Sequence, residues 1–221
     1  MKYLGKPVFA LVVALSGCGL ADYEAKMAEE QARVRHIEDE NKNLEDPLDI
    51  PPPKKENDKE AKLPDFFFRP PKGISRTANK DLYGGLLWVY PRTGASEGVQ
   101  DVYIGFSKGR KDYVKDVLKK LPSSTPPKNS TTEITPWGRD PVRFETVTVD
   151  DPSSSLILYI LPTTDQQILV GFRLDRKTES SQLSQRVAMS LESIGVGNDA
   201  GKLRKEFRQR SSASKTSSQS K

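Results

Sequence analysis

Six consecutive apolar residues, 156–161, constrain the fold of this chain more than any other segment. Successive side chains of a strand point to opposite faces of a sheet, so a strand that is apolar throughout has to be covered on both faces. The run therefore predicts a central strand in a sheet that has other elements packed against each of its two sides.

Other runs of β-branched and aromatic residues, bounded by Gly, Pro or Asp, predict further strands. Residues 143–149 alternate in side-chain character, which is typical of an edge or half-solvated strand. Short connections between the last three strands favour antiparallel neighbours. The predicted strands are residues 65–68, 85–90, 99–106, 143–149, 156–161 and 168–174, with a short one near 132–134.

Two stretches with apolar side chains at helical spacing, 112–121 and 180–194, predict helices packed on this sheet. Ser180 or Ser181 suits the N-cap of the second helix, and Gly195 suits its C-cap. The predicted fold class is α+β, an antiparallel sheet of about six strands with two packed helices, in a globular domain over residues 64–197. The apolar stripes are Val114, Val117, Leu118 and Leu121 in the first helix and Leu183, Val187, Leu191 and Ile194 in the second.

The chain begins with a basic segment, continues with the apolar run 8–15 and a few small residues, and reaches its only cysteine, Cys18. This layout predicts a secretory signal peptide over residues 1–17 that is cleaved from the mature chain. A membrane span needs roughly 20 apolar residues, and Asp22 and Glu24 end the apolar run well short of that length. The layout therefore disfavours an uncleaved transmembrane helix.

The sequence Leu15-Ser16-Gly17-Cys18 resembles the lipobox of bacterial lipoproteins, in which a large aliphatic residue and two small residues precede the cysteine that is lipidated. The resemblance implies that Cys18 carries acyl chains such as palmitate and holds the mature chain on a membrane of the cell envelope. Because Gly19 rather than Asp follows, analogy with enteric bacteria favours the outer membrane, facing the periplasm, over the inner one. The alternative is an ordinary signal peptide with an incidental cysteine.

Residues 18–45 are expected to form the lipid anchor and a spacer helix, because residues 22–44 lack Pro and Gly and are rich in helix-forming residues. His36, the only histidine, is expected on its solvent side. The helix either dimerises as a coiled coil or is a solvated spacer between lipid and domain. The positions of its possible seam are Tyr23, Met27, Glu30, Val34, Ile37, Asn41 and Leu44.

The segments that flank the domain are rich in charge. Pro47 is expected to end the spacer helix, and residues 46–63, with three successive prolines and many charges, to form an extended linker. Residues 198–221 hold seven basic and two acidic residues with a Ser-rich end, which predicts a disordered basic tail. Such a tail is either solubilising or binds anionic headgroups or wall carboxylates. Because the signal peptide and tail supply much of the net charge of +5, it does not indicate a nucleic-acid-binding domain.

The order of elements in residues 64–197 resembles the Mog1/PsbP-like fold. The likeness consists of an aromatic strand before a Pro-Pro-Lys-Gly turn at residues 66–73, a first helix, a three-strand meander and a closing helix that ends near Ile194. Members of that fold take part in trafficking, photosystem assembly and bacterial envelope functions. The resemblance therefore implies a binding module.

The domain contains neither cysteine nor histidine, which excludes thiol, imidazole and histidine–metal chemistry there. We expect no metal and no cofactor. Asp150-Asp151 before Pro152 is interpreted as a solvated turn, because two acids without further ligands hold calcium poorly. Tyr83-Gly84-Gly85 is interpreted as a turn as well, because no helix follows to complete a phosphate-binding loop.

The loop 135–141 is the best candidate for recognition. Pro, Gly and Asp favour a turn there, and Trp137 and Arg139 are residue types enriched at binding hot spots. The alternative is that Trp137 covers the core and Arg139 pairs with Asp140. Trp88 is expected in the core, and the basic group Lys108, Arg110 and Lys111 is a weaker candidate.

The sequence therefore predicts a membrane-anchored envelope lipoprotein that carries a small binding module and is not an enzyme. Its expected partners are the membrane, through Cys18, and an envelope protein or cell-wall component, with no nucleic acid; the oligomeric state stays open. The alternative is a lipid-anchored enzyme that uses carboxylate or Ser/Lys chemistry. A deep pocket with converging acids would favour the enzyme, and a flat face exposing Trp137 would favour the module.

Overall fold

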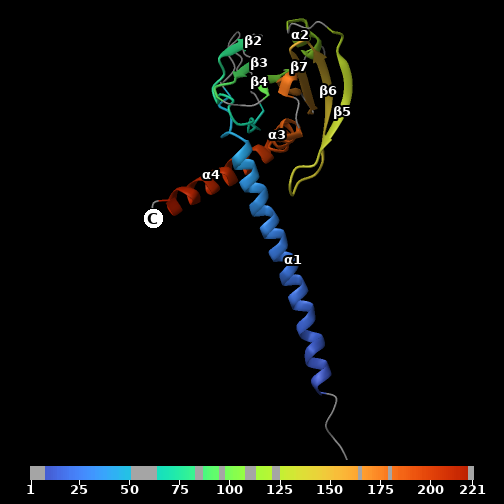
Figure 1. Ribbon diagram of the computed structural model, residues 1–221, viewed down its shortest axis with the longest axis vertical. Helices are drawn as coiled ribbons and strands as arrows, with labels where there is room; N and C mark the ends of the chain where they lie inside the picture. Colours follow the sequence, from blue (N-terminus) through green and yellow to red (C-terminus); the bar gives the residue numbers. More distant parts are fainter. Residues whose placement is uncertain are drawn as a thin grey trace, which may run out of the picture. The chain divides into compact units, whose positions relative to one another are not determined.

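The computed structural model describes residues 8–50, 64–82, 87–94, 98–107, 113–120, 125–163, 166–178 and 181–218 (Figure 1). The chain divides into two compact units, the first ending at Lys42 and the second beginning at Asn43. The first unit consists of most of one long helix, and the second contains the sheet and the remaining helices.

The long helix, α1, spans Val8–Asn43 and confirms the helix expected over residues 22–44 except at its last residue. Leu44 leaves the helix because its side chain is fully buried in the second unit, where its backbone bridges to Pro71. His36 lies on α1 beside Glu40, with 3.4 Å between Nε2 and Oε1. Among the described residues, no helix has the length and apolar content that a membrane span requires.

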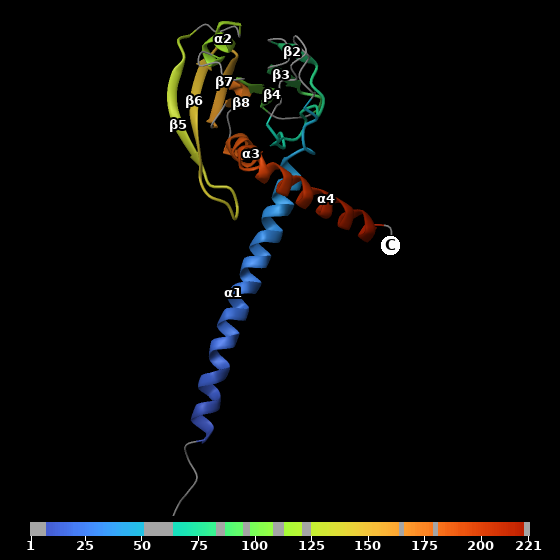
Figure 2. The ribbon, with the colours of Figure 1, turned by 180° about the vertical axis from the view of Figure 1, so that it is seen from behind.

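The second unit is built on one antiparallel sheet of seven strands in the order β2-β3-β4-β8-β7-β6-β5 (Figures 1 and 2). The predicted α+β class is confirmed, and the short strand β2 at one edge has no counterpart among the predicted strands. The bounds are β2 Lys80–Leu82, β3 Leu87–Pro91, β4 Val99–Phe106, β5 Lys128–Ile134, β6 Val142–Asp150, β7 Ser154–Pro162 and β8 Gln167–Asp175.

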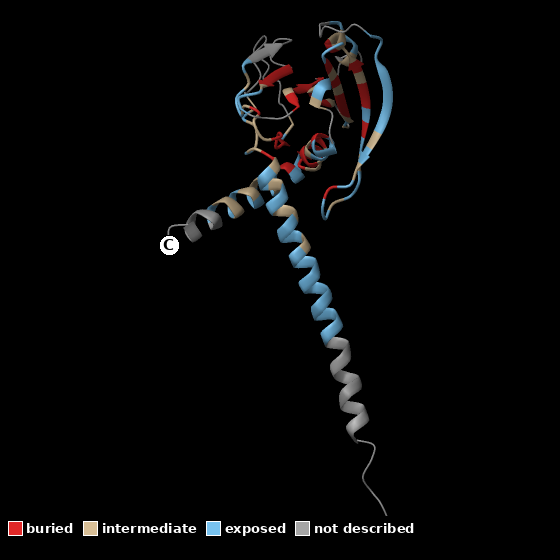
Figure 3. Ribbon diagram, in the orientation of Figure 1, coloured by how far each residue is buried: buried red, intermediate tan, exposed pale blue. Residues whose placement is uncertain are grey.

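The apolar run 156–161 lies in β7, which pairs with β6 on one side and β8 on the other. Tyr159 faces one core cluster together with helix α3, Ser181–Glu192. Leu158 and Ile160 face a second cluster together with helix α2, Tyr113–Lys120. In Figure 3 the central strands are coloured mainly as buried. The expectation of a central strand covered on both faces is confirmed.

Strand β6 is one position in from the sheet edge, because β5 pairs along nearly all of it. The short strand expected near residues 132–134 is part of β5, which is seven residues long. Phe144, Thr146, Val147 and Val149 of β6 are buried, whereas Glu145 is exposed. Phe144 faces the cluster that contains Tyr159, whereas Val147 and Val149 face the cluster that contains Leu158. The expectation of an edge or half-solvated strand is therefore wrong for β6, and the polar strand β5 occupies the edge.

A two-stranded sheet joins the two ends of the predicted domain. Its strands are β1, Phe66–Phe67, and β9, Gly195–Val196, which pair antiparallel. The expectation that Gly195 caps α3 is wrong, because Gly195 pairs with Phe67 instead. The single-turn helix η1, Arg176–Thr178, connects β8 toward α3.

The tail predicted to be disordered forms helix α4, Asn198–Ser218, so that prediction is wrong for these residues. Ala200 is fully buried, and the guanidinium of Arg204 pairs with the Asp65 carboxylate and donates to the Phe66 carbonyl oxygen at 2.7 Å. Phe207 lies against Phe67, with 6.4 Å between ring centroids. Only a few residues hold α4 against the domain. They are separated by the charged residues whose abundance had predicted a disordered tail.

Residues 44–50 belong to the second unit, so the linker predicted from residue 46 begins too early. The Leu48 amide donates to the Phe68 carbonyl at 3.1 Å, and the Asp49 amide donates to the Arg76 carbonyl at 3.0 Å. Leu48 and Ile50 pack against the core. The remainder of the predicted linker, 51–63, lies outside the described residues.

Candidate functional site

The loop between β5 and β6 carries the two residues predicted to contact a partner. Pro136 is buried at its start, and the Arg139 amide closes a turn by donating to the Pro136 carbonyl at 3.1 Å. Gly138 has φ of 65° within this turn, a left-handed conformation that favours glycine. The turn chemistry expected from Pro, Gly and Asp is therefore present.

Arg139 fixes this loop to the end of α3. Its guanidinium donates to the carbonyl oxygen of Ile194 at 2.7 Å and also to that of Glu192. Both carbonyls lie at the C-terminus of the helix, where a cation is favoured by unpaired acceptors and by the helix dipole. Arg139 thus holds the loop in place. These bonds use guanidinium N–H groups that were predicted to bind a partner.

Trp137 is 50% exposed on the loop that Arg139 fixes, whereas Trp88 is only 2% exposed in the core. The expectation that Trp88 is a core residue is confirmed. The alternative in which Trp137 covers the core does not fit its exposure. The structure therefore presents a large indole on a turn whose backbone is held at both ends.

A hollow of about 590 Å³ opens next to Trp137 in the chain. Two of the residues that line it, Asp140 and Asp199, are exposed acids from different parts of the sequence. Carboxylates suit a cationic group, which can pair with them as Lys202 Nζ does with Asp199 at 3.4 Å. The other lining residues are Gly138, Arg139, Pro141 and Val142.

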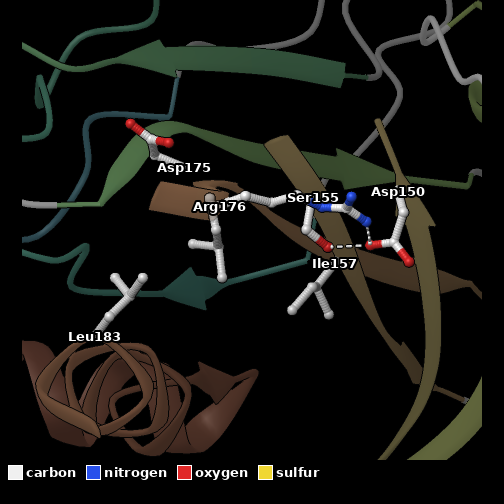
Figure 4. Close-up of a pocket in the computed structure, with 7 residues that line it drawn as sticks. Asp150, Ser155, Ile157, Asp175, Arg176 and Leu183 are labelled. Carbon is white, nitrogen blue, oxygen red and sulfur yellow. Dashed lines mark hydrogen bonds and ion pairs between the residues drawn. The ribbon is translucent and has the colours of Figure 1, made fainter. Parts of the chain in front are cut away.

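A second cleft, of about 440 Å³, lies near α3 where β6 and β8 end and β7 begins (Figure 4). Asp150 is its most strongly engaged acid. The Ser155 hydroxyl donates to Asp150 Oδ1 at 2.8 Å, Arg176 lies 3.1 Å from the same oxygen, and Lys128 Nζ lies 3.3 Å from Oδ2. Figure 4 shows the Arg176 side chain reaching toward Asp150, whereas the Asp175 carboxylate points away from it.

These contacts keep Asp150 ionised. Hydrogen bonds from Ser155 and Arg176 hold the pKa of the Asp150 carboxyl below its ordinary value, and burial opposes them only in part. A general acid at neutral pH needs the opposite shift. The arrangement of Asp150 is that of an ion-paired turn, since the Asp151 amide donates to the Ser154 carbonyl at 2.8 Å and closes the β6–β7 hairpin.

Three tyrosines in the sheet also have shifted pKa values. Burial raises the pKa of Tyr90, Tyr103 and Tyr159 above the ordinary value, so each keeps its proton at neutral pH. The Tyr90 hydroxyl donates to the Asp49 carbonyl at 3.2 Å, and Arg173 donates to the Tyr103 hydroxyl at 3.1 Å. The hydroxyls of Tyr90 and Tyr103 therefore have hydrogen-bond partners within the fold.

Several residues singled out from the sequence lie where the structure gives no description. Tyr83-Gly84-Gly85 and the basic group Lys108, Arg110 and Lys111 lie outside the described residues, and the side chain of Cys18 does as well. Within the described part of the chain, no three His, Cys, Asp or Glu side chains gather as a metal site would require. Asp199 is the residue of the hollow that sequence reasoning missed, because α4 was not predicted to join the domain.

No protein-family model matches this chain, and no curated protein matches its sequence. The lipobox and the resemblance to the Mog1/PsbP-like fold therefore stay predictions from sequence.

Proposed function

We propose that this chain is a lipid-anchored protein of the bacterial envelope whose α+β domain binds an envelope protein or cell-wall component through the Trp137 loop. The observation that carries the proposal is the half-exposed Trp137 on a loop that Arg139 fixes to α3. The cellular location and the binding module are separate parts of the proposal. The first comes from the sequence around Cys18, and the second from the surface of the domain.

A preformed loop supports recognition because little conformational entropy is lost when it binds. Tryptophan is among the residues that contribute most when they anchor an interface. The acids Asp140 and Asp199 line the hollow that follows Trp137 in the chain, which favours a partner that presents an amine or guanidinium. A basic side chain of an envelope protein and an amine of the cell wall both meet this requirement.

The enzyme alternative receives less support. Its best candidate acid, Asp150, forms ion pairs with two cations and has a lowered pKa. Asp175 points away from Asp150 in the same cleft (Figure 4), so the two carboxylates do not converge as an acid–base pair would. The exposed Trp137 matches the feature expected of a binding module.

Crosslinking in cells tests the binding surface. A photo-reactive amino acid at Asp140, beside Trp137, should give a defined adduct, and the same group at the exposed Glu145 of β6 is the matched control. The adduct at position 140 should fall at least several-fold with Trp137→Ala and less with Trp137→Phe. An adduct that is unchanged by Trp137→Ala, or identical at both positions, would contradict this surface. Because this replacement removes one of the proposed acids, the same group is also placed at the exposed Thr135 of the loop, and the absence of an adduct at both loop positions would contradict the surface too.

Metabolic labelling tests the anchor independently. Full-length protein produced in bacteria with labelled palmitate should carry the label and fractionate with membranes. Cys18→Ser should abolish the label, and the protein should fractionate with membranes only as an uncleaved precursor or not at all. Label that persists in Cys18→Ser would refute lipidation at Cys18, even if the crosslinking result stood.

A further inference from the structure

Helix α1 carries most of the large apolar surface that the described chain leaves exposed. Of the five exposed large hydrophobic residues, only Trp137 lies elsewhere. The extent is visible on α1 in Figure 3, where the described part of the helix is mainly coloured as exposed. The four residues on α1 are Leu20 at 59%, Tyr23 at 60%, Met27 at 43% and Val34 at 51% exposed.

These side chains form one stripe rather than a scatter. Leu20, Met27 and Val34 recur every seven residues, and Tyr23 lies three residues after the first of them, as the a and d positions of a heptad do. Ile37 continues the d series and Asn41 the a series. Leu44, which the sequence would place next, is buried in the second unit, so the stripe ends at Asn41.

The charges beside the stripe select the direction of a partner helix. The e positions that flank it are Glu24, Gln31 and Glu38, and the first two g positions are Lys26 and Arg33. A parallel pair places g opposite e of the partner, so Arg33 faces Glu38 and Lys26 faces Gln31. An antiparallel pair would place e opposite e and g opposite g, which sets like charges against each other.

We propose that two copies of this chain associate through α1 as a parallel, in-register, two-stranded coiled coil over residues 20–41. The partner is a second copy because the same helix supplies both the apolar stripe and the complementary charges. Val34 at an a position favours a two-stranded assembly, and Asn41 at another a position specifies the register. This inference does not depend on the Trp137 surface.

Two features limit the strength of this pairing. Glu30 occupies a d position, where it faces its counterpart, although Arg33 on the same helix lies 3.6 Å from its carboxylate. The stripe also covers only about three heptads, and short coiled coils are marginal. The proposed lipid anchor would offset this, because two chains held on one membrane share a direction and a high effective concentration.

Cysteine crosslinking tests direction and register together. In full-length protein that keeps Cys18, and with it the proposed anchor, Tyr23→Cys and Ile37→Cys place a thiol near each end of the stripe. The parent chain without an added cysteine reports any disulfide that Cys18 itself forms. Ala25→Cys, on the opposite side of the helix, is the matched control. A parallel, in-register pair should give disulfide-linked dimers at both positions 23 and 37, at least ten-fold more than at position 25.

Other outcomes overturn the proposal. In an antiparallel pair the two copies of position 23 would be roughly 20 Å apart at 1.5 Å per residue, so disulfides would form only between a Tyr23→Cys chain and an Ile37→Cys chain. Equal yields at positions 23, 25 and 37 would indicate random collision. The absence of dimer at 23 and 37 would show that α1 does not pair.

Sedimentation equilibrium provides a second measurement without crosslinks. The full-length chain with Cys18 in place should sediment as a dimer in mild detergent, and Val34→Gln in the stripe should weaken association at least ten-fold. Ala25→Gln introduces the same side chain on the outer side and should leave association unchanged. A monomeric parent chain, or equal effects of the two substitutions, would refute the coiled coil. Neither result would bear on the Trp137 surface, which the photo-crosslinking experiment tests.

Discussion

The guanidinium carbon of Arg69 lies 5.0 Å from the ring centroid of Phe207, which joins the strand end after β1 to helix α4. Arg69 is only 5% exposed, and its Nε donates to the Glu45 carbonyl at 3.0 Å. Its backbone amide donates to Ser193 Oγ at 2.8 Å. One residue therefore links the segment after α1, the end of α3 and α4, three parts that are far apart in the sequence.

Removal of the aromatic ring should release α4 from this contact. Phe207→Ala would uncover the buried guanidinium of Arg69, and we expect a loss of about 1–3 kcal/mol in the free energy of unfolding. Limited proteolysis should then cut the chain within residues 198–212 before the sheet is degraded. Arg208→Ala, an exposed neighbour, is the control and should leave both readouts unchanged. Equal protease resistance of Phe207→Ala and the parent would contradict this role.

Gly195 should be intolerant of even one methyl group. A Cβ at this position would lie 2.5 Å from Leu203 Cδ1 and 3.0 Å from the Ala200 backbone nitrogen. The leucine can rotate, but the helix backbone cannot move without separating α4 from β9. We expect Gly195→Ala to lower the free energy of unfolding by about 1–3 kcal/mol, as measured by urea denaturation.

Gly201 supplies the matched control for that substitution. A Cβ there would have only Asp65 Oδ2, at 3.9 Å, as a neighbour. Because alanine is favoured over glycine inside a helix by about 1 kcal/mol, Gly201→Ala should be neutral or stabilising. If Gly195→Ala behaved in the same way, the close packing of α4 on β9 would be wrong.

Arg139 should affect stability and partner binding together. Arg139→Met keeps the length of the side chain but leaves the Ile194 and Glu192 carbonyls without their donor, at a cost of about 1–3 kcal/mol. Arg139→Lys should restore part of this stability, because an ammonium can satisfy one carbonyl. The crosslink at position 140 should decrease in Arg139→Met at temperatures where the domain remains folded. A fully stable Arg139→Met protein would show that the loop is fixed by other contacts.

The sheet was predictable because its signals are local and strong. The apolar run in β7 and the stripes of α2 and α3 specify a layered domain without knowledge of any distant contact. Helix α4 was not predictable from composition, since its docking depends on Ala200, Leu203, Arg204 and Phe207 among many charges and serines. Leu203 and Phe207, four residues apart, were the available signal for a helix with one apolar side.

The candidate site was predictable only in part, for the same physical reason. Trp137 and Arg139 were found from residue type and turn chemistry, which are local properties. The bonds from Arg139 to the end of α3 span more than fifty residues of sequence, so no pattern near position 139 indicates them. Asp199 reaches the hollow only because α4 packs beside β9. Long-range contacts thus decide that Arg139 positions the loop and that Trp137 is exposed on its surface.

The lowered pKa of Asp150 predicts a specific dependence of stability on pH. In the unfolded chain this carboxyl takes up a proton near its ordinary pKa of 3.8, whereas in the folded chain it does so at lower pH. Between the two values the unfolded state binds more protons, so the free energy of unfolding falls as the pH falls. The contribution of Asp150 is complete above its ordinary pKa and disappears below its folded pKa. Asp150→Asn should therefore be less stable than the parent at pH 6, by about 0.2–1 kcal/mol for partly exposed ion pairs, and the difference should shrink as the pH falls below the ordinary pKa of the carboxyl.

Urea denaturation at several pH values measures this difference, with Glu145→Gln on the same strand as the control for an exposed acid. Because Lys128 and Arg176 are well exposed, salt should screen their pairs with Asp150 and reduce the difference at pH 6. The hydrogen bond from Ser155 does not depend on salt in this way, so part of the difference should persist at high ionic strength. A difference between Asp150→Asn and the parent that stays constant from pH 6 to pH 2 would show that the substitution acts through packing rather than through the carboxylate.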